Sequence, residues 1–79
     1  MTESGSVKRV KLTDDFTVAV GDVVDRQKLD AAVSAAKNVG KDVKVIEPGV
    51  AALAGFHPGR LNIWLEAGNK VRALTYEPQ

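Results

Sequence analysis

The chain has 79 residues, no cysteine, 11 basic and 10 acidic residues, and a hydrophobic fraction of 44%. This length supports one hydrophobic core, and the composition is that of a folded protein, so we expect neither a second domain nor a disordered chain. The lack of cysteine excludes disulfides and thiolate metal sites, and a net charge of +1 provides no field that would attract nucleic acid or an anionic membrane.

Residues 1–6 are small and polar, and we expect them to form a flexible tail before a single domain at residues 7–79. The N-terminus lacks the apolar run of a signal peptide, and the longest apolar stretch, residues 50–56, is too short to span a bilayer. We therefore expect a cytoplasmic monomer that binds no membrane, although a signal removed before this form of the chain would leave secretion open.

Two runs of residues near the N-terminus have the alternation of β-strands. Residues 7–12 mix apolar and charged side chains as an edge strand does, and residues 16–20 alternate more clearly. Asp14 and Asp15 mark a turn between them, so the two runs could form a hairpin. The basic side chains fit a solvated strand face, because no aromatic residues are interleaved to stack on bases, and no nucleic-acid partner is predicted.

Apolar side chains with helical spacing predict an amphipathic helix over about residues 24–39. The apolar positions are Leu29, Ala32, Val33, Ala36 and Val39. Asp22 and Asp25 are both suitable N-caps, Lys37 suits the dipole of the last turn, and Gly40 follows the expected end.

The C-terminal half contains three more strands by pattern. Residues 43–46 are β-branched, and residues 60–65 place Leu61, Ile63 and Leu65 on one face. Residues 70–76 follow a tight turn and should complete an antiparallel hairpin with residues 60–65.

The connection between the first two of these strands is a long apolar loop at about residues 50–58. Proline and glycine at both of its ends make it a poor helix or strand. A connection this long does not suit a tight antiparallel turn, so we expect the strands at 43–46 and 60–65 to be parallel neighbours. The alternative is a loop folded onto the core by Leu53 and Phe56.

The strand that ends in Pro48-Gly49, the exposed loop and the following Arg60-Leu61-Asn62-Ile63 together resemble the potato inhibitor I family of serine protease inhibitors. The likeness is greatest to the fungal and bacterial elastase-inhibitor branch, and it covers residues 21–76. It implies an α+β fold in which one helix packs on a small mixed β-sheet, with an exposed binding loop between two parallel strands.

The resemblance also implies site residues. The protease-binding loop corresponds to Ala52, Leu53, Ala54, Gly55 and Phe56. Ala54 takes the primary-specificity position, and a slip of one residue would place Leu53 there. Arg60 and Asn62 match the polar residues that support the loop from the next strand. Leu53 and Gly55 stand where the family usually has a hydroxyl residue and an acid, so neither can bond to Arg60 through a side chain.

Serine protease inhibition without a cofactor is therefore the leading hypothesis, and the small Ala54 suggests an elastase-like or subtilisin-like target. The alternative is a non-inhibitory protein-interaction module on the same scaffold. An enzyme is not expected, because no nucleophile, base and orienting group can be nominated together and His57 is the only histidine.

Overall fold

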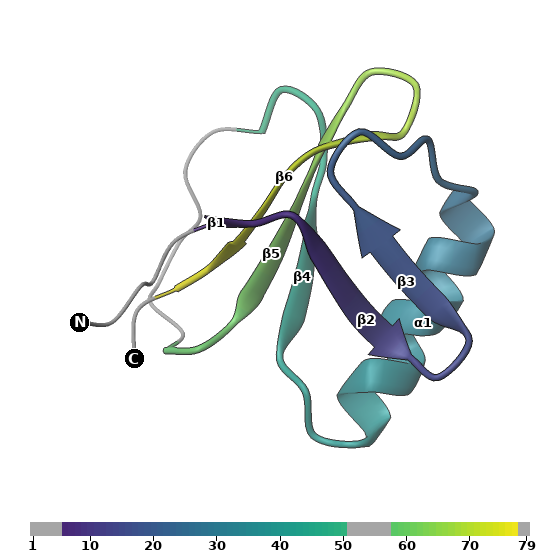
Figure 1. The fold of residues 1–79 in the computed structure, drawn as a ribbon, viewed down its shortest axis with the longest axis vertical. Coiled ribbons are helices and arrows are strands. Elements are labelled where there is room, and N and C mark those ends of the chain that lie inside the picture. Colours follow the sequence, from purple (N-terminus) through teal and green to yellow (C-terminus); the bar gives the residue numbers. More distant parts are fainter. Residues whose placement is uncertain (1–5, 51–57, 78–79) are drawn as a thin grey trace.

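A computed structural model describes residues 6–50 and 58–77, and Figure 1 shows how their strands and helix are arranged. In chain order the elements are β1 (Ser6–Val7), β2 (Arg9–Thr13), β3 (Phe16–Ala19), α1 (Arg26–Asn38), β4 (Val43–Ile46), β5 (Leu61–Glu66) and β6 (Lys70–Tyr76). The described residues thus form an α+β fold with one helix, as the sequence predicts.

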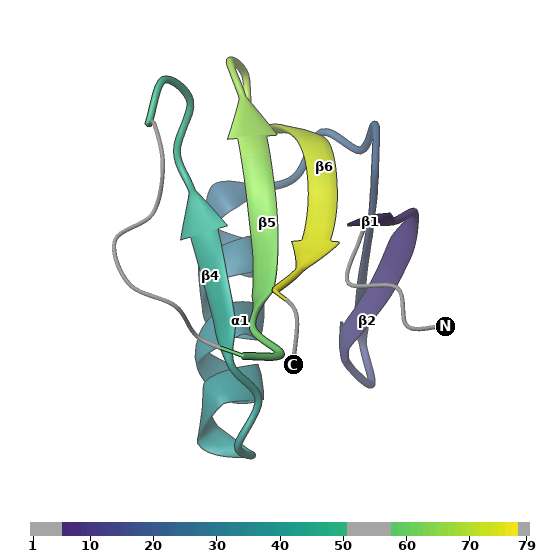
Figure 2. The same cartoon turned by 90° about the vertical axis from the view of Figure 1, so that its left-hand side faces the viewer.

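The central sheet has four strands in the order β1-β6-β5-β4. β4 and β5 run parallel with Ile46 opposite Trp64, so the parallel pairing predicted from the long connection is confirmed. β5 and β6 form the predicted antiparallel hairpin, and its turn contains Gly68 at φ 81° and Asn69 at φ 60°. Figure 2 shows β4, β5 and β6 side by side with α1 behind them.

β2 and β3 form a separate antiparallel pair, so the predicted N-terminal hairpin is confirmed. Its first strand is divided at Lys8, because β1 pairs with β6 whereas β2 pairs with β3. Residues 21–24 then run alongside the start of β6 and form backbone hydrogen bonds with it. The Gly21 N–H donates to the Val71 carbonyl and the Val71 N–H donates to the Asp22 carbonyl, both at 2.8 Å. These bonds tie the hairpin to the sheet.

The helix begins at Arg26 because Asp25 is its N-cap. The Asp25 carboxylate accepts hydrogen bonds from the backbone N–H groups of Gln27 at 3.0 Å and Lys28 at 3.3 Å. Asp22, the other candidate cap, instead accepts from a backbone N–H at the end of β3. The predicted start at residue 24 was therefore wrong by two residues.

The helix ends at Asn38, and Val39 is the C-cap. The N–H groups of Gly40 and Lys41 both donate to carbonyls of the last turn at 3.0 Å, which closes the helix in a Schellman arrangement. The chain leaves the helical path at Val39, a residue that is 74% exposed. Its predicted place on the apolar face was wrong.

Replacing Asp25 with alanine is expected to lower the free energy of unfolding by about 1 kcal/mol, because two backbone N–H groups lose their acceptor. Urea unfolding followed by circular dichroism measures the change. Asp25→Asn is the matched control and should stay near wild type, since asparagine caps about as well as aspartate. Equal stabilities of the alanine and asparagine variants would contradict the assignment of the cap.

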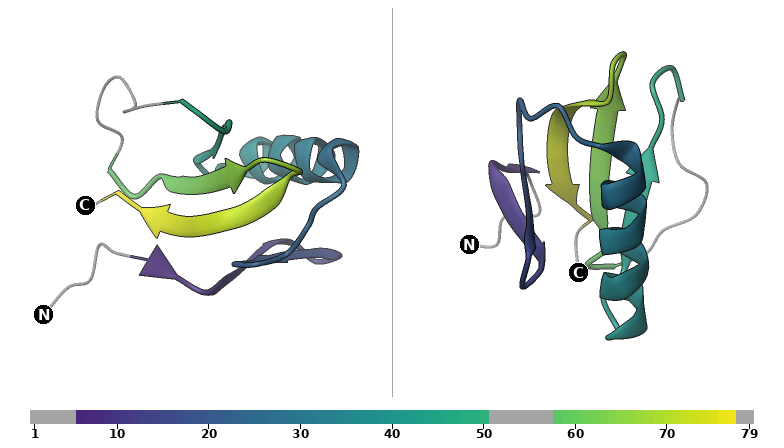
Figure 3. Two further views of the ribbon diagram at one scale, coloured as in Figure 1. Left: turned by 90° about the horizontal axis from the view of Figure 1, so that it is seen from above. Right: turned by 90° about the vertical axis from the view of Figure 1, so that its right-hand side faces the viewer.

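The core lies between one face of the sheet and a layer formed by α1 and the β2–β3 hairpin, whose relative positions Figure 3 shows. Its buried members are Leu12, Val18, Leu29, Ala32, Val33, Ala36, Val43, Leu61, Ile63, Leu65, Val71 and Leu74. The four remaining helix positions predicted as apolar are all among them. The hairpin contributes Leu12 and Val18, so it is part of the domain and not an appendage.

Candidate functional site

The predicted binding loop joins β4 to β5. The residues predicted to form its contact with a protease, Ala52, Leu53, Ala54, Gly55 and Phe56, lie outside the described residues, as does His57. The described residues on either side, 47–50 and 58–62, show how the two ends of this segment are held.

The segment starts with a turn at the end of β4. The Val50 N–H donates to the Glu47 carbonyl at 3.2 Å. Pro48 occupies the second position of this turn, and Gly49 occupies the third at φ 81°. These residue types suit a type II turn, because proline presets φ near −65° and glycine reaches a positive φ without a steric penalty. The chain therefore leaves β4 in a defined direction.

An arginine of the helix binds the first residue of this turn. Arg26 Nη1 donates to Glu47 Oε1 at 2.8 Å, Nη2 donates to Oε2, and Nε donates to Asp30 Oδ1 at 3.0 Å. The hydrogen bond from Arg26 lowers the pKa of Glu47, and the bonds to Glu47 and Asp30 raise the pKa of Arg26. Arg26 and Glu47 are therefore both charged at neutral pH, and α1 is joined to the end of β4.

The two predicted support residues are both buried, Arg60 at 7% and Asn62 at 3% exposure. Asn62 alternates with the core residues Leu61 and Ile63, so it points to the face opposite the core. Arg60 Nη2 and Asn62 Oδ1 have no hydrogen-bond partner among the residues that the structure describes. A buried polar group without a partner costs roughly 1–3 kcal/mol, so this donor and this acceptor favour a ligand that satisfies them.

Glu77, which follows β6, fixes the orientation of Arg60. Its Oε2 accepts from Arg60 Nε at 2.9 Å, and the two side chains are only 15% and 9% exposed. The Glu77 N–H also donates to the Arg60 carbonyl at 2.9 Å, and the Gly59 N–H donates to the Glu77 carbonyl at 3.1 Å. Because the ion pair uses Nε, the Nη2 atom of the guanidinium is left for another acceptor.

Glu77 was not among the residues predicted from the sequence. In the structure Leu61 pairs with Tyr76, and the next residues outward are Arg60 and Glu77. Counting outward from the turn would have placed Arg60 opposite Tyr76 instead, because the register shifts by one residue between Trp64 and Leu65.

Other side chains on the face of the sheet that carries Asn62, opposite the core, are also held in place. Ile46 is buried although it lies outside the main core cluster. Trp64 Nε1 donates to Thr75 Oγ1 at 2.9 Å, and the guanidinium of Arg72 lies 5.2 Å from the centre of the Trp64 ring. Thr75 is also the register partner of Asn62, so the surroundings of the predicted support are ordered.

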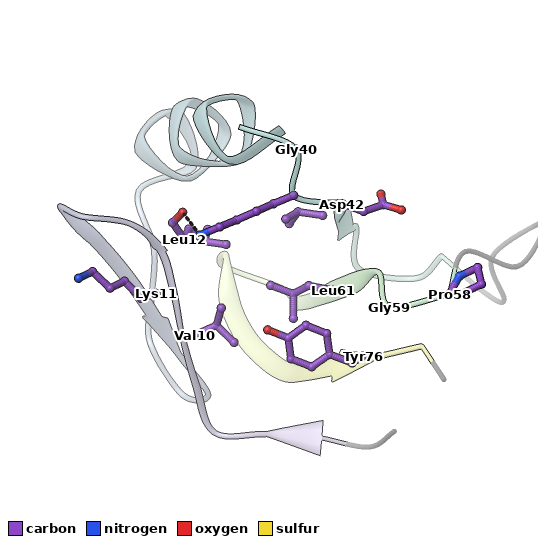
Figure 4. Close-up of a pocket in the computed structure, with 11 residues that line it drawn as sticks. Val10, Lys11, Leu12, Gly40, Asp42, Pro58, Gly59, Leu61 and Tyr76 are labelled. Carbon is purple, nitrogen blue, oxygen red and sulfur yellow. Dashed lines mark hydrogen bonds between the residues drawn. The ribbon is translucent and has the colours of Figure 1, made fainter. Parts of the chain in front are cut away.

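A cleft of about 440 Å³ opens where β2 diverges from β5 and β6. Figure 4 shows Val10 and Tyr76 facing each other across it, with Leu61 between them. Lys41 also lines the cleft, and its Nζ donates to the Leu12 carbonyl at 3.3 Å. The cleft is therefore mainly apolar, has Lys11, Lys41 and Asp42 among its lining residues, and is large enough to receive side chains of a partner.

Comparison with known protein families, curated proteins and solved structures found no match to this chain. In the described part of the chain, no helix has the length and apolar character needed to cross a membrane. Within the same residues, no three His, Cys, Asp or Glu side chains gather in a way that could hold a metal ion. The geometry around Arg60 and Asn62 is therefore the structural feature that bears most directly on function.

Proposed function

We propose that the chain is a serine protease inhibitor of the potato inhibitor I type, which binds its target through a substrate-like loop at about residues 50–58. The observation that carries the proposal is the buried pair of Arg60 Nη2 and Asn62 Oδ1, which lack partners among the described residues. They lie directly after this segment in the chain. One donor and one acceptor two residues apart suit the carbonyl and N–H groups of an extended main chain held over them.

Leu53 and Gly55, which depart from the family pattern, agree with a support in which Arg60 and Asn62 bond to the main chain of the loop; we call this support a brace. Leu53 and Gly55 have no side-chain oxygen, so they offer Arg60 nothing beyond their backbone groups. An acidic side chain would satisfy a donor only, whereas a peptide unit offers both an acceptor and a donor. A support that presents Nη2 together with Oδ1 therefore matches a loop of this composition.

Such a brace would turn a substrate into an inhibitor. An extended segment binds a protease cleft by main-chain hydrogen bonds, with one side chain in the specificity pocket. A segment already held in its bound shape avoids the entropy cost of ordering. By resemblance, Ala54 enters the pocket and is flanked by Ala52, Leu53, Gly55 and Phe56. Its small side chain suits the shallow pocket of an elastase-like or subtilisin-like protease.

The cleft between β2 and the sheet favours a second candidate, a non-inhibitory interaction module on the same scaffold. Its apolar walls include Val10 and Tyr76, which belong to elements outside the predicted loop. A partner that inserts an apolar side chain there would need neither Arg60 nor Asn62. Substitutions at Arg60 or Asn62 should therefore weaken protease inhibition, whereas substitutions at Val10 or Tyr76 should weaken binding of such a partner.

The test is a titration of the protein against elastase, subtilisin, trypsin and chymotrypsin, with mass spectrometry of any cleaved chain. We expect inhibition of the first two and slow cleavage after Ala54. Asn62→Ala should speed this cleavage by up to about tenfold, the effect of one lost hydrogen bond. Lys44→Ala is the matched control, because Lys44 is the exposed register partner of Asn62, and it should cleave as wild type does.

Indifference of all four proteases, with no cleavage between residues 52 and 56, would overturn the inhibitor proposal and favour the interaction module. Cleavage after Leu53 would keep the proposal and shift the specificity position by one residue. Equal cleavage rates of wild type and Asn62→Ala would remove Asn62 from the support.

A further inference from the structure

We propose that Arg26 and Glu47 form a clamp that fixes the start of the binding loop to helix α1, which makes Arg26 a positioning residue for inhibition. This inference rests on the proposed inhibitor function. It concerns the residues before the loop, whereas Arg60 and Asn62 follow it. Neither Arg26 nor Glu47 is part of the support that the family resemblance implies.

The geometry specifies direction as well as contact. A bidentate bond between a planar guanidinium and a carboxylate fixes the relative orientation of both groups, which a single bond to an ammonium would not. Here Arg26 binds both oxygens of Glu47 and is itself held by Asp30, one helical turn further along α1. The position of Glu47 is therefore set by the helix.

A role in helix stability accounts for the bond of Arg26 to Asp30, which is an i,i+4 pair within α1, but not for its contact with Glu47. Arg26 is the first residue of the helix, where the backbone N–H groups carry partial positive charge and a cation is unfavourable. The first turn contains no acidic residue, and the capping bonds come from Asp25. The ion pair with Glu47 is also partly exposed, and such pairs contribute little to overall stability. What the contact does supply is a fixed link between two elements 21 residues apart.

Glu47 lies where such a link has most effect on the loop. Its carbonyl accepts the Val50 N–H, so it is the first residue of the turn that leads away from β4. At the far end, Glu77 holds Arg60 through a second arginine–carboxylate pair. Both ends are thus attached to elements outside the loop. After cleavage, the residues before the cut would stay beside those after it, so the bond could form again before the product leaves.

The clamp should depend on pH, because Glu47 can bind Arg26 as an ion pair only when its carboxyl group is ionised. Among the described residues, Arg26 from α1 and Lys44 from β4 act on the Glu47 carboxylate, and the Arg26 hydrogen bond is the largest influence on it, while Asp30 acts on Arg26. The pKa of Glu47 lies below the ordinary value of 4.5. The clamp is therefore complete above that value and is lost as pH falls through the lowered pKa of Glu47.

The experiment compares wild type, Arg26→Met and the reversed pair Arg26→Glu with Glu47→Arg. Lys28→Met is the matched control, because it removes an exposed cation from the same turn of α1. In Arg26→Met we expect an unchanged urea midpoint, roughly fivefold faster hydrogen exchange at Val50 and roughly fivefold faster cleavage by the inhibited protease. The carbon-13 titration of the Glu47 carboxyl should return to its ordinary midpoint. The reversed pair should restore slow exchange and slow cleavage.

Unchanged Val50 exchange and an unchanged Glu47 titration in Arg26→Met would overturn the clamp, whether or not the wild type inhibits. Faster exchange with wild-type cleavage rates would overturn its role in inhibition and leave the inhibitor proposal standing. A wild type that inhibits no protease would overturn the inhibitor proposal and, with it, the positioning role, even if the exchange and titration results show the contact itself.

Discussion

Leu12→Ala is expected to lower the free energy of unfolding by about 2–5 kcal/mol, because it empties a fully enclosed position in the core. Leu12 is 2% exposed and packs with α1 and the sheet from the N-terminal hairpin. Native proteins of this kind are stable by only about 5–15 kcal/mol, so the change removes a large part of the total. Urea unfolding with an unchanged slope would measure it directly.

Lys11→Ala is the control for this prediction, because Lys11 is the exposed neighbour of Leu12 on the same strand. Its only described ion pair, with Asp14, is 3.9 Å long and solvent-exposed, so a change within about 0.5 kcal/mol is expected. Near-equal stabilities of the two variants would mean that the hairpin does not pack on the core as described.

The second large effect is expected for Arg60→Ala, which should destabilise the domain by about 3 kcal/mol and speed cleavage of the loop. Removing one member of a buried ion pair typically costs about 3–5 kcal/mol, because the remaining charge loses an opposite charge while it is still largely buried. We expect the lower end of this range, because Glu77 follows the last strand and its carboxylate can turn towards water. Unfolding in urea and mass spectrometry of the protease-treated chain give the two quantities.

The double variant Arg60→Met with Glu77→Leu separates stability from support. Replacing both members of a buried pair by apolar side chains is often neutral, so stability should return towards wild type. Cleavage should remain fast, because the Nη2 donor is still missing. Recovery of slow cleavage together with stability would show that Arg60 acts on the loop only by keeping the domain folded.

The elements that depend on local pattern were predictable. The spacing of Leu29, Ala32, Val33 and Ala36 identified the buried face of α1, and all four are in the core. The length of the connection between β4 and β5 was enough to predict that they run parallel. Boundaries were less accurate, since Asp22 and Asp25 are equally good caps by sequence and only the turn after β3 decides between them.

The contacts that define the candidate site were harder to predict, because they join residues distant in sequence. Arg26 and Glu47 are 21 positions apart, and Arg60 and Glu77 are 17 apart. The resemblance supplied Arg60 and Asn62 but not the carboxylate that orients Arg60. The sequence of the N-terminal hairpin does not show that Leu12 and Val18 belong to the core. Alternation identifies the apolar face of a strand, but it does not indicate which element packs against that face.

The order of strands in the sheet has a consequence for a chain that has been cut in the loop. β5 and β6 come after the loop, yet they lie between β4 on one side and β1 on the other, both of which come before it. A single cut therefore yields a short fragment inserted into the middle of a sheet built by the longer one. The fragments are held by backbone pairing along both edges of the inserted hairpin. Separating them requires two strand interfaces and the shared core to open together, so the nicked protein behaves as a two-chain complex whose stability depends on concentration.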